Sequence, residues 1–125
     1  MTEKRTILVV EDESMLLGLL KAILEDEGYR VETAEDGAEA VEVFRRCQKE
    51  IGVVLSDMGL PKLGGWEVFQ KLKEIRPDVK VILASGFVDD SVRNDMIKQG
   101  ASDVIQKPYV PNSILERIKE LMDSK

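Results

Sequence analysis

The chain has 125 residues, 43% hydrophobic and 34% charged, a size and balance that fit one domain able to bury a core. A net charge of -6, without a cluster of Lys or Arg, argues against nucleic acid or an anionic membrane as a direct partner. No segment has the apolar length of a signal peptide or a membrane span, so we expect a cytoplasmic protein. With one cysteine and no histidine, an internal disulfide and imidazole chemistry are excluded.

The first part of the chain predicts a strand, a helix and a second strand. Thr6–Val10 is an apolar, β-branched run that stops at acidic residues, and it indicates a buried strand. From Ser14 onward apolar residues recur at helical spacing, and Gly28 lies where a left-handed residue would end that helix. Tyr29–Ala34 is short and partly alternating, which predicts the second strand.

The middle of the chain predicts a helix, a central strand and a further helix. Asp36 and Glu39 have the spacing of a capping box, so a helix is expected to begin there. Ile51–Asp57 is an apolar run that ends on a carboxylate and indicates a buried strand of a parallel sheet. The next helix is expected near Gly65, because Pro61 and a pair of glycines intervene.

The last part predicts two more strands, each followed by a helix. The strands are Val79–Ala84 and Asp103–Gln106; Asp90–Gln99 is a helix with few apolar residues, and Pro111 opens the final helix. The regular alternation of strands and helices favours one doubly wound α/β domain with a five-stranded parallel sheet and five helices. We expect the flavodoxin-like order 2-1-3-4-5, in which the first and third strands are neighbours.

Polar side chains follow four of the predicted strands, at the sheet edge where such folds keep their ligand sites. They are Glu11 and Asp12, Asp57, Ser85 and Lys107. The expected order brings the acidic pair beside Asp57, and two like charges about 4 Å apart repel by roughly 4 kcal/mol at an effective dielectric near 20. A cation among them is therefore expected, and oxygen-only ligands favour Mg²⁺ or Mn²⁺. Lys107 and the Ser85 hydroxyl suit a phosphate.

Each of these residues also has a simpler structural explanation. Asp57 could cap the helix that follows it, and the acidic pair could be solvated loop residues. Ser85 and Lys107 could be an ordinary strand-end hydroxyl and a surface lysine. Because the expected topology brings all of them together, we favour the metal and phosphate roles.

These motifs resemble the receiver domain of two-component response regulators, over essentially the whole chain, 1–125. The matching residues are Glu11-Asp12, Asp57 followed by Pro61 and Gly65, Ser85-Gly86 and Lys107-Pro108. Each motif alone is weak, but the set in this order and spacing is specific. The stretches Ser85-Gly86-Phe87 and Ile105-Gln106-Lys107-Pro108-Tyr109 most resemble receivers attached to hybrid histidine kinases, or single-domain relatives of them.

The resemblance implies a role for each site residue. Asp57 would accept a phosphoryl group from a histidine kinase or histidine phosphotransfer protein. Asp12, Asp57 and the backbone carbonyl of Gly59 would hold Mg²⁺, with Glu11 helping through water. Ser85 would be the switch hydroxyl and Lys107 the phosphate-binding lysine, and the peptide bond that precedes Pro108 would be cis.

Three positions depart from the family pattern. Val104 stands where many receivers carry an aromatic switch residue, so coupling through an aromatic rotamer is not expected. Gly59 and Phe87 offer no polar side chain to orient water, which predicts slow self-dephosphorylation rather than enzymatic turnover. With no output domain expected in this length, the signal would leave through a partner protein, at the surface formed by Asp90–Gln99, Asp103–Gln106 and the helix that Pro111 opens.

Two other functions remain open at this point. A phosphohydrolase of the haloacid dehalogenase kind also uses a strand-end Asp nucleophile with Mg²⁺, but its pattern has a second Asp where this chain has Gly59. A degenerate receiver could serve only as a binding scaffold. The complete set of acidic residues, hydroxyl and lysine counts against that possibility.

Overall fold

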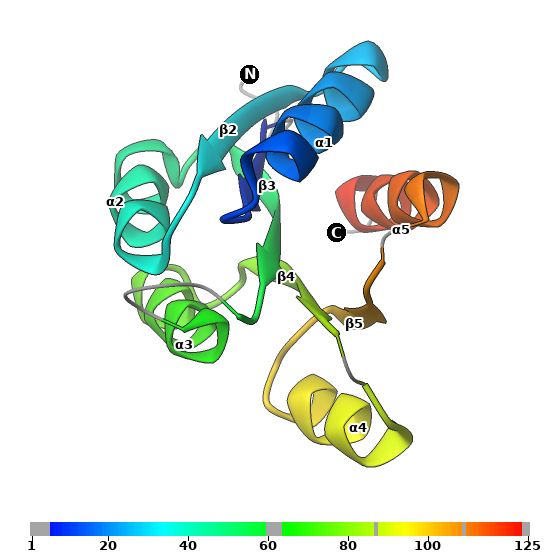
Figure 1. Cartoon of the computed structure of the whole chain (residues 1–125). Coiled ribbons are helices and arrows are strands. Elements are labelled where there is room, and N and C mark those ends of the chain that lie inside the picture. Colours follow the sequence, from blue (N-terminus) through cyan, green and yellow to red (C-terminus); the bar gives the residue numbers. More distant parts are fainter. Residues whose placement is uncertain (1–5, 60–63, 87, 109, 124–125) are drawn as a thin grey trace.

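The protein is one parallel sheet with helices on both faces, and the computed structural model describes residues 6–59, 64–86, 88–108 and 110–123. The strand order is β2-β1-β3-β4-β5, and each neighbouring pair is parallel (Figure 1). The predicted flavodoxin-like order is therefore confirmed. The strands are β1 (Thr6–Val10), β2 (Arg30–Ala34), β3 (Ile51–Asp57), β4 (Lys80–Ser85) and β5 (Asp103–Gln106).

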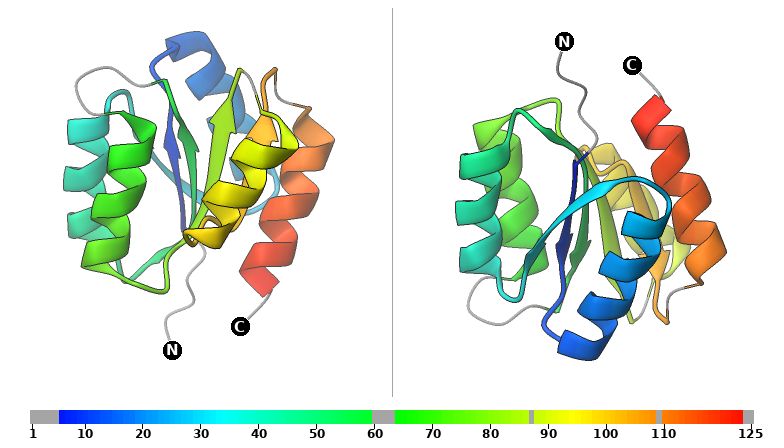
Figure 2. Two further views of the ribbon diagram at one scale, coloured as in Figure 1. Left: turned by 90° about the horizontal axis from the view of Figure 1, so that it is seen from below. Right: turned by 90° about the horizontal axis from the view of Figure 1, so that it is seen from above.

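Two helices cover one face of the sheet and three cover the other (Figure 2). The first group is α1 (Ser14–Asp26) and α5 (Pro111–Asp123); the second is α2 (Gly37–Cys47), α3 (Gly65–Ile75) and α4 (Asp90–Lys98). The expected five helices are thus confirmed, with ends that differ from the predicted ones by a residue or two. The bounds of the fourth strand also differ from the prediction. Ser85 is the last residue of β4, whereas the sequence predicts that it follows the strand. Among the described residues, no helix combines the length and apolar character that a membrane crossing requires.

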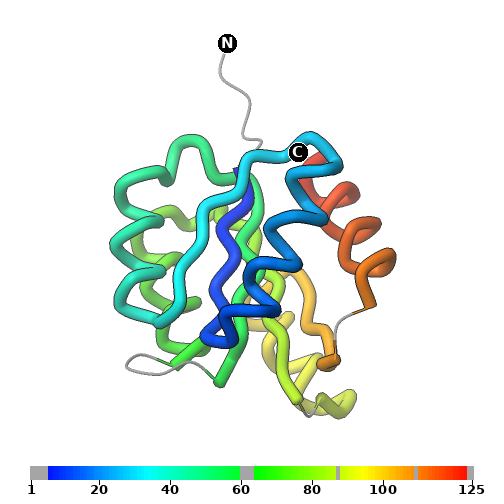
Figure 3. The backbone as a smooth tube through the Cα atoms, turned by 45° about the horizontal axis from the view of Figure 1, so that its top comes forward, coloured from blue at the N-terminus to red at the C-terminus, as the bar shows by residue number. Residues whose placement is uncertain are grey.

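The strands are buried on both faces because their side chains alternate between two hydrophobic clusters. In β1, Leu8 and Val10 pack with Phe44 of α2, whereas Ile7 and Val9 pack against α1 and α5. The apolar runs of the sequence follow from this double burial. Since all strands run the same way, their carboxyl ends gather at one edge of the sheet (Figure 3).

The helix ends are set by local contacts that the sequence predicts. The Asp36 carboxylate accepts a hydrogen bond from the Glu39 N–H at 2.8 Å, and the Glu39 carboxylate accepts one from the Glu35 N–H at 2.7 Å. The capping box is confirmed, although its return contact reaches Glu35 and not Asp36 itself. Gly28 has a positive φ of 95° just past α1, as expected for a left-handed helix end.

The start of α3 lies directly against the end of β3. The Gly65 N–H donates to the Met58 carbonyl at 3.1 Å. A Cβ at Gly65 would lie 2.4 Å from the Asp57 carbonyl oxygen and 2.4 Å from the Met58 Cα, both backbone atoms that cannot move freely. Only glycine therefore allows this approach, which holds the backbone that carries Asp57.

We predict that Gly65→Ala destabilises the domain by about 1–3 kcal/mol, because the new methyl group overlaps backbone atoms. Gly18 is the matched control, since it lies inside α1, is exposed, and has no atom within 4 Å of an added Cβ. Gly18→Ala should stabilise the domain by about 0.5–1 kcal/mol through helix propensity. Urea unfolding of both variants measures the two effects. Equal stability of Gly65→Ala and wild type would show that the close approach relaxes without cost.

Candidate functional site

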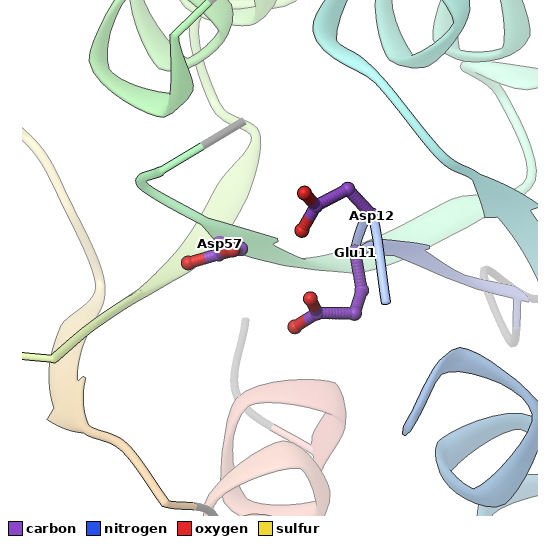
Figure 4. A group of neighbouring side chains, drawn as sticks. All are labelled: Glu11, Asp12 and Asp57. Atoms are coloured by element: carbon purple, nitrogen blue, oxygen red, sulfur yellow. The ribbon is translucent and has the colours of Figure 1, made fainter. Parts of the chain in front are cut away.

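Three carboxylates meet at the carboxyl ends of β1 and β3. Glu11 and Asp12 follow β1, Asp57 ends β3, and one carboxylate oxygen of each lies within 4.8 Å of the others (Figure 4). The two strands are hydrogen-bonded neighbours, with Val10 opposite Ser56, so the strand order brings these side chains together. The predicted convergence is confirmed.

The three carboxylates differ in their exposure to solvent. Glu11 is 1% exposed and Asp57 is 6% exposed, whereas Asp12 faces solvent. The two buried carboxylates each accept a hydrogen bond from a nearby backbone N–H, Glu11 from Glu13 at 3.2 Å and Asp57 from Gly59 at 3.3 Å. Glu11 and Asp57 therefore form the buried part of the site, and Asp12 forms its exposed side.

The environment of Glu11 disfavours its negative charge. Burial raises the pKa of Glu11 above its ordinary value, and the negative charge of Asp57 adds to that effect. The hydrogen bond from Glu13 and the ammonium of Lys107 act in the opposite direction on this pKa without reversing its shift. A cation bound among the three carboxylates, in addition to Lys107, would relieve the remaining repulsion between them.

Lys107 supplies positive charge next to the two buried carboxylates, Glu11 and Asp57. Its Nζ lies 3.2 Å from a Glu11 oxygen and 3.4 Å from an Asp57 oxygen. Burial by itself would lower the pKa of Lys107, but the negative charges of Asp57 and Glu11 outweigh it and raise the net pKa. The peptide bond between Lys107 and Pro108 is cis, as predicted.

Ser85 and Gly59 reach the same edge of the sheet from the neighbouring chain segments. Ser85 ends β4, where its carbonyl accepts a hydrogen bond from the Lys107 N–H at 2.8 Å. Gly59 follows Asp57 by two residues, is exposed, and has no atom within 4 Å of an added Cβ. Pro61, Phe87 and Tyr109 lie outside the described residues, so the prediction of slow self-dephosphorylation stays a prediction.

The simpler explanation of Asp57 as a helix cap is wrong. The N-cap of α3 is Gly64, which makes no side-chain capping bond. Asp57 instead accepts from the Gly59 N–H and approaches Lys107. Its carboxylate is therefore turned toward the acidic cluster and not toward the start of the helix.

Sequence reasoning did not identify the direct contact between Lys107 and Glu11. The two residues are 96 positions apart, and the sequence places both at strand ends without saying which side chains touch. Glu11 is buried and therefore needs a cation close to its carboxylate. Within the described part of the site, Lys107 provides that cation. Local sequence carries no signal for this contact, because the tertiary structure sets the burial of Glu11.

The donor set fits a hard divalent cation. Every side-chain ligand available in the cluster is a carboxylate oxygen, the ligand type that Mg²⁺ and Mn²⁺ prefer, and no described cysteine or histidine lies in the group. Burial first, and the charge of Asp57 second, raise the pKa of Glu11, so a cation in the cluster would favour its charged form. A fold of this type with an acidic cluster and a lysine at one sheet edge defines a phosphoacceptor domain.

Comparison with known proteins gives the family directly. The family model of the response regulator receiver domain matches residues 7–119. The chain therefore belongs to the receiver domains of two-component signalling, which are phosphoacceptors rather than catalytic enzymes. This assignment excludes the phosphohydrolase alternative.

The chain is similar to relatives of very different length. It is 30% identical over 118 residues to the chemotaxis protein CheY of Thermotoga maritima, covering 94% of this chain and 97% of CheY. It is 35% identical over 120 residues to the probable transcriptional regulator ycf27 of Porphyridium aerugineum, covering 96% of this chain. The chain spans only 49% of ycf27, and only 12% of the sensor kinase CckA of Brucella abortus.

A solved structure supports the same fold and site. The CheX-CheY-BeF3-Mg+2 complex from Borrelia burgdorferi matches with a TM-score of 0.89 at 27% identity, covering 95% of this chain and 90% of that chain. That relative was crystallised with magnesium. The acidic cluster described above is consistent with such a site.

We predict that Mg²⁺ binds at this cluster and that Asp12→Asn lowers the affinity by about tenfold or more, because the change would remove one of the few charged groups available to hold the ion. Trp66 is the single tryptophan and lies in the first turn of α3, so its fluorescence reports a MgCl₂ titration at the neighbouring site. Asp26→Asn, at the far end of α1, makes the same change of charge and should leave the affinity unchanged. Equal affinities of Asp12→Asn and wild type would remove Asp12 from the ligand set.

Proposed function

We propose that Asp57 accepts a phosphoryl group from a histidine kinase or a histidine phosphotransfer protein, and that the domain 1–125 passes this signal to a protein partner. The observation that carries the proposal is the position of Asp57, a carboxylate at the end of the central strand beside two further carboxylates and a lysine. Its exposure of 6% leaves a side for the donor to approach while most of the carboxylate is shielded from water.

The chemistry follows from the groups around Asp57. One carboxylate oxygen would attack the phosphorus of the donor's phosphohistidine, forming a P–O bond as the P–N bond breaks. Lys107, already 3.4 Å from the other oxygen of Asp57, would pair with the added negative charge, and the Ser85 hydroxyl would donate a hydrogen bond to a phosphoryl oxygen. The electron pair of the broken bond returns to the donor's imidazole.

Mg²⁺ is the cation that we propose for the cluster. Asp12, Asp57 and the backbone carbonyl of Gly59 would hold it, and Glu11 would act through water. When bound, the ion supplies positive charge that offsets both the carboxylates and the incoming phosphoryl group. Glu11, being buried and paired with Lys107, keeps that lysine directed at Asp57.

We predict that acetyl phosphate with Mg²⁺ adds one phosphoryl group to the wild-type chain and none to Asp57→Asn, because an amide oxygen is a poor nucleophile. Intact-mass spectrometry gives the count. Asp78→Asn, an exposed site at the opposite edge of the sheet, is the control and should be labelled like wild type. Full labelling of Asp57→Asn would move the acceptor elsewhere, and no labelling of the wild type would favour a binding scaffold.

The surface beside the acceptor suits a protein donor. Helix α1 begins just after the acidic pair and exposes Met15 at 85% and Leu19 at 54%. Leu19 also lines a groove between α1 and the start of α5, whose other walls include Ile23, Lys107 and Pro108. Because Lys107 belongs to both the groove and the acceptor site, a donor bound in the groove would lie next to Asp57. We propose that the phosphodonor docks there.

We predict that Leu19→Glu lowers the rate of phosphorylation by about tenfold or more with any histidine kinase that labels the wild type. The reason is that a charge replaces an exposed apolar contact. Labelling by acetyl phosphate should not change, since a small donor needs no docking surface. Ile97→Glu, the same kind of change on exposed α4, is the matched control. Radiolabelled kinase assays compare the phosphorylation rates of the two variants with that of the wild type. A Leu19→Glu chain labelled at the wild-type rate would exclude α1 from the docking surface.

The output surface is proposed to be formed by α4, β5 and α5. Ser85 and Lys107, the two residues expected to bind the phosphoryl group, are joined through the backbone hydrogen bond between β4 and the end of β5. A shift of either residue therefore acts on this side of the sheet. Val104 in β5 is fully buried and carries no ring whose rotation could report the change.

A further inference from the structure

Helix α4 is attached to the domain differently from the other helices. All nine of its residues are described, and none is fully buried, whereas each of the other four helices buries at least three residues. Met96 is the α4 residue that packs, partly buried, against the core cluster. Since little apolar surface holds α4 on the domain, its polar contacts contribute a larger share of the free energy that keeps it in place.

Arg93 connects α4 to β5 through two hydrogen bonds. Its Nη2 donates to a carboxylate oxygen of Asp103 at 2.7 Å, and its Nη1 donates to the Val104 carbonyl at 3.1 Å. The rigid planar fork of a guanidinium holds two N–H donors side by side for two acceptors, a geometry that a single ammonium nitrogen does not offer. Asp103 is 8% exposed and also accepts from the Val104 N–H at 2.8 Å, so the acceptor side of this contact is rigid.

The same carboxylate is also bound from α5. Arg117 Nε donates to the second oxygen of Asp103 at 2.9 Å, and Arg117 Nη2 donates to the Ser102 carbonyl at 3.1 Å. A buried carboxylate that loses its cation is strongly unfavourable. Here, loss of Arg93 leaves Arg117 in place, so α4 can detach from β5 without leaving Asp103 uncompensated.

The contact lies close in the chain to the acceptor site. Val104 precedes Lys107 by three residues, and Lys107 reaches Asp57. Ser85 ends β4, the strand from which the chain continues to α4. Movement of Ser85 or Lys107 would therefore displace the two segments that Arg93 joins.

We propose that the contact of Arg93 with Asp103 and the Val104 carbonyl restrains α4 in the unphosphorylated chain, and that phosphorylation signals by weakening this restraint. The second half rests on the proposed function of Asp57. An intact contact favours the unphosphorylated arrangement, so its removal must favour the phosphorylated one to the same extent.

The restraint itself is tested without phosphoryl group or metal. Amide hydrogen exchange of α4 should be about five- to tenfold faster in Arg93→Met, while exchange in α1 and α3 stays at the wild-type rate. Arg93→Lys should fall between, because it keeps the charge but loses one acceptor. Lys98→Met removes the same charge from exposed α4 and should leave exchange near wild type. Unchanged α4 exchange in Arg93→Met would overturn the restraint.

The signalling half is tested with beryllofluoride and Mg²⁺, a phosphoryl mimic, followed by NMR titration. Arg93→Met should bind about three- to tenfold more tightly than wild type and Lys98→Met. Equal or weaker binding would show that the contact persists in both states and would overturn the switch. Failure of the wild type to bind would instead overturn the proposed function, with the exchange result still deciding the restraint.

Discussion

The meeting of Glu11, Asp57 and Lys107 is the constraint on which the rest of the site depends. Glu11 is almost fully buried beside a second buried carboxylate, an arrangement that is unfavourable unless a cation is near. Lys107 is that cation, 3.2 Å and 3.4 Å from the two side chains. Glu11 follows β1, Asp57 is the last residue of β3, and Lys107 follows β5, so this one contact joins three strands and spans the centre of the sheet.

The same electrostatic arrangement prepares the site for both of its proposed ligands. The exposed side, formed by Asp12, leaves room for a divalent cation, and the lysine side can take an added anion. The cation would offset the net negative charge of the cluster, and Lys107 would pair with the added phosphoryl group. Gly65 contributes in a different way, since the absence of a side chain lets α3 begin against the backbone of Asp57 and Met58.

Rigidity is distributed unevenly around this site. The β3 end is held by the sheet and by α3, and the core clusters fill both faces with side chains such as Phe44 and Leu55. Helix α4, in contrast, buries no residue fully and is tied to β5 by Arg93. A change of charge at Asp57 is therefore expected to be expressed on the side of the sheet where packing is weakest.

The sequence by itself determined the elements, their order and the carboxylates and lysine that meet at the sheet edge, because hydrophobic period, capping residues and strand-end polar residues are local signals. Parallel strands with a known order then place Asp12 near Asp57 without any coordinates. Only the tertiary structure decided that Glu11 is buried while its neighbour Asp12 is exposed, that Lys107 pairs with Glu11, and that Asp103 binds arginines from two helices. Those contacts join residues 10 to 96 positions apart. Their geometry depends on the direction of each side chain at the end of its element, which packing sets and local sequence does not encode.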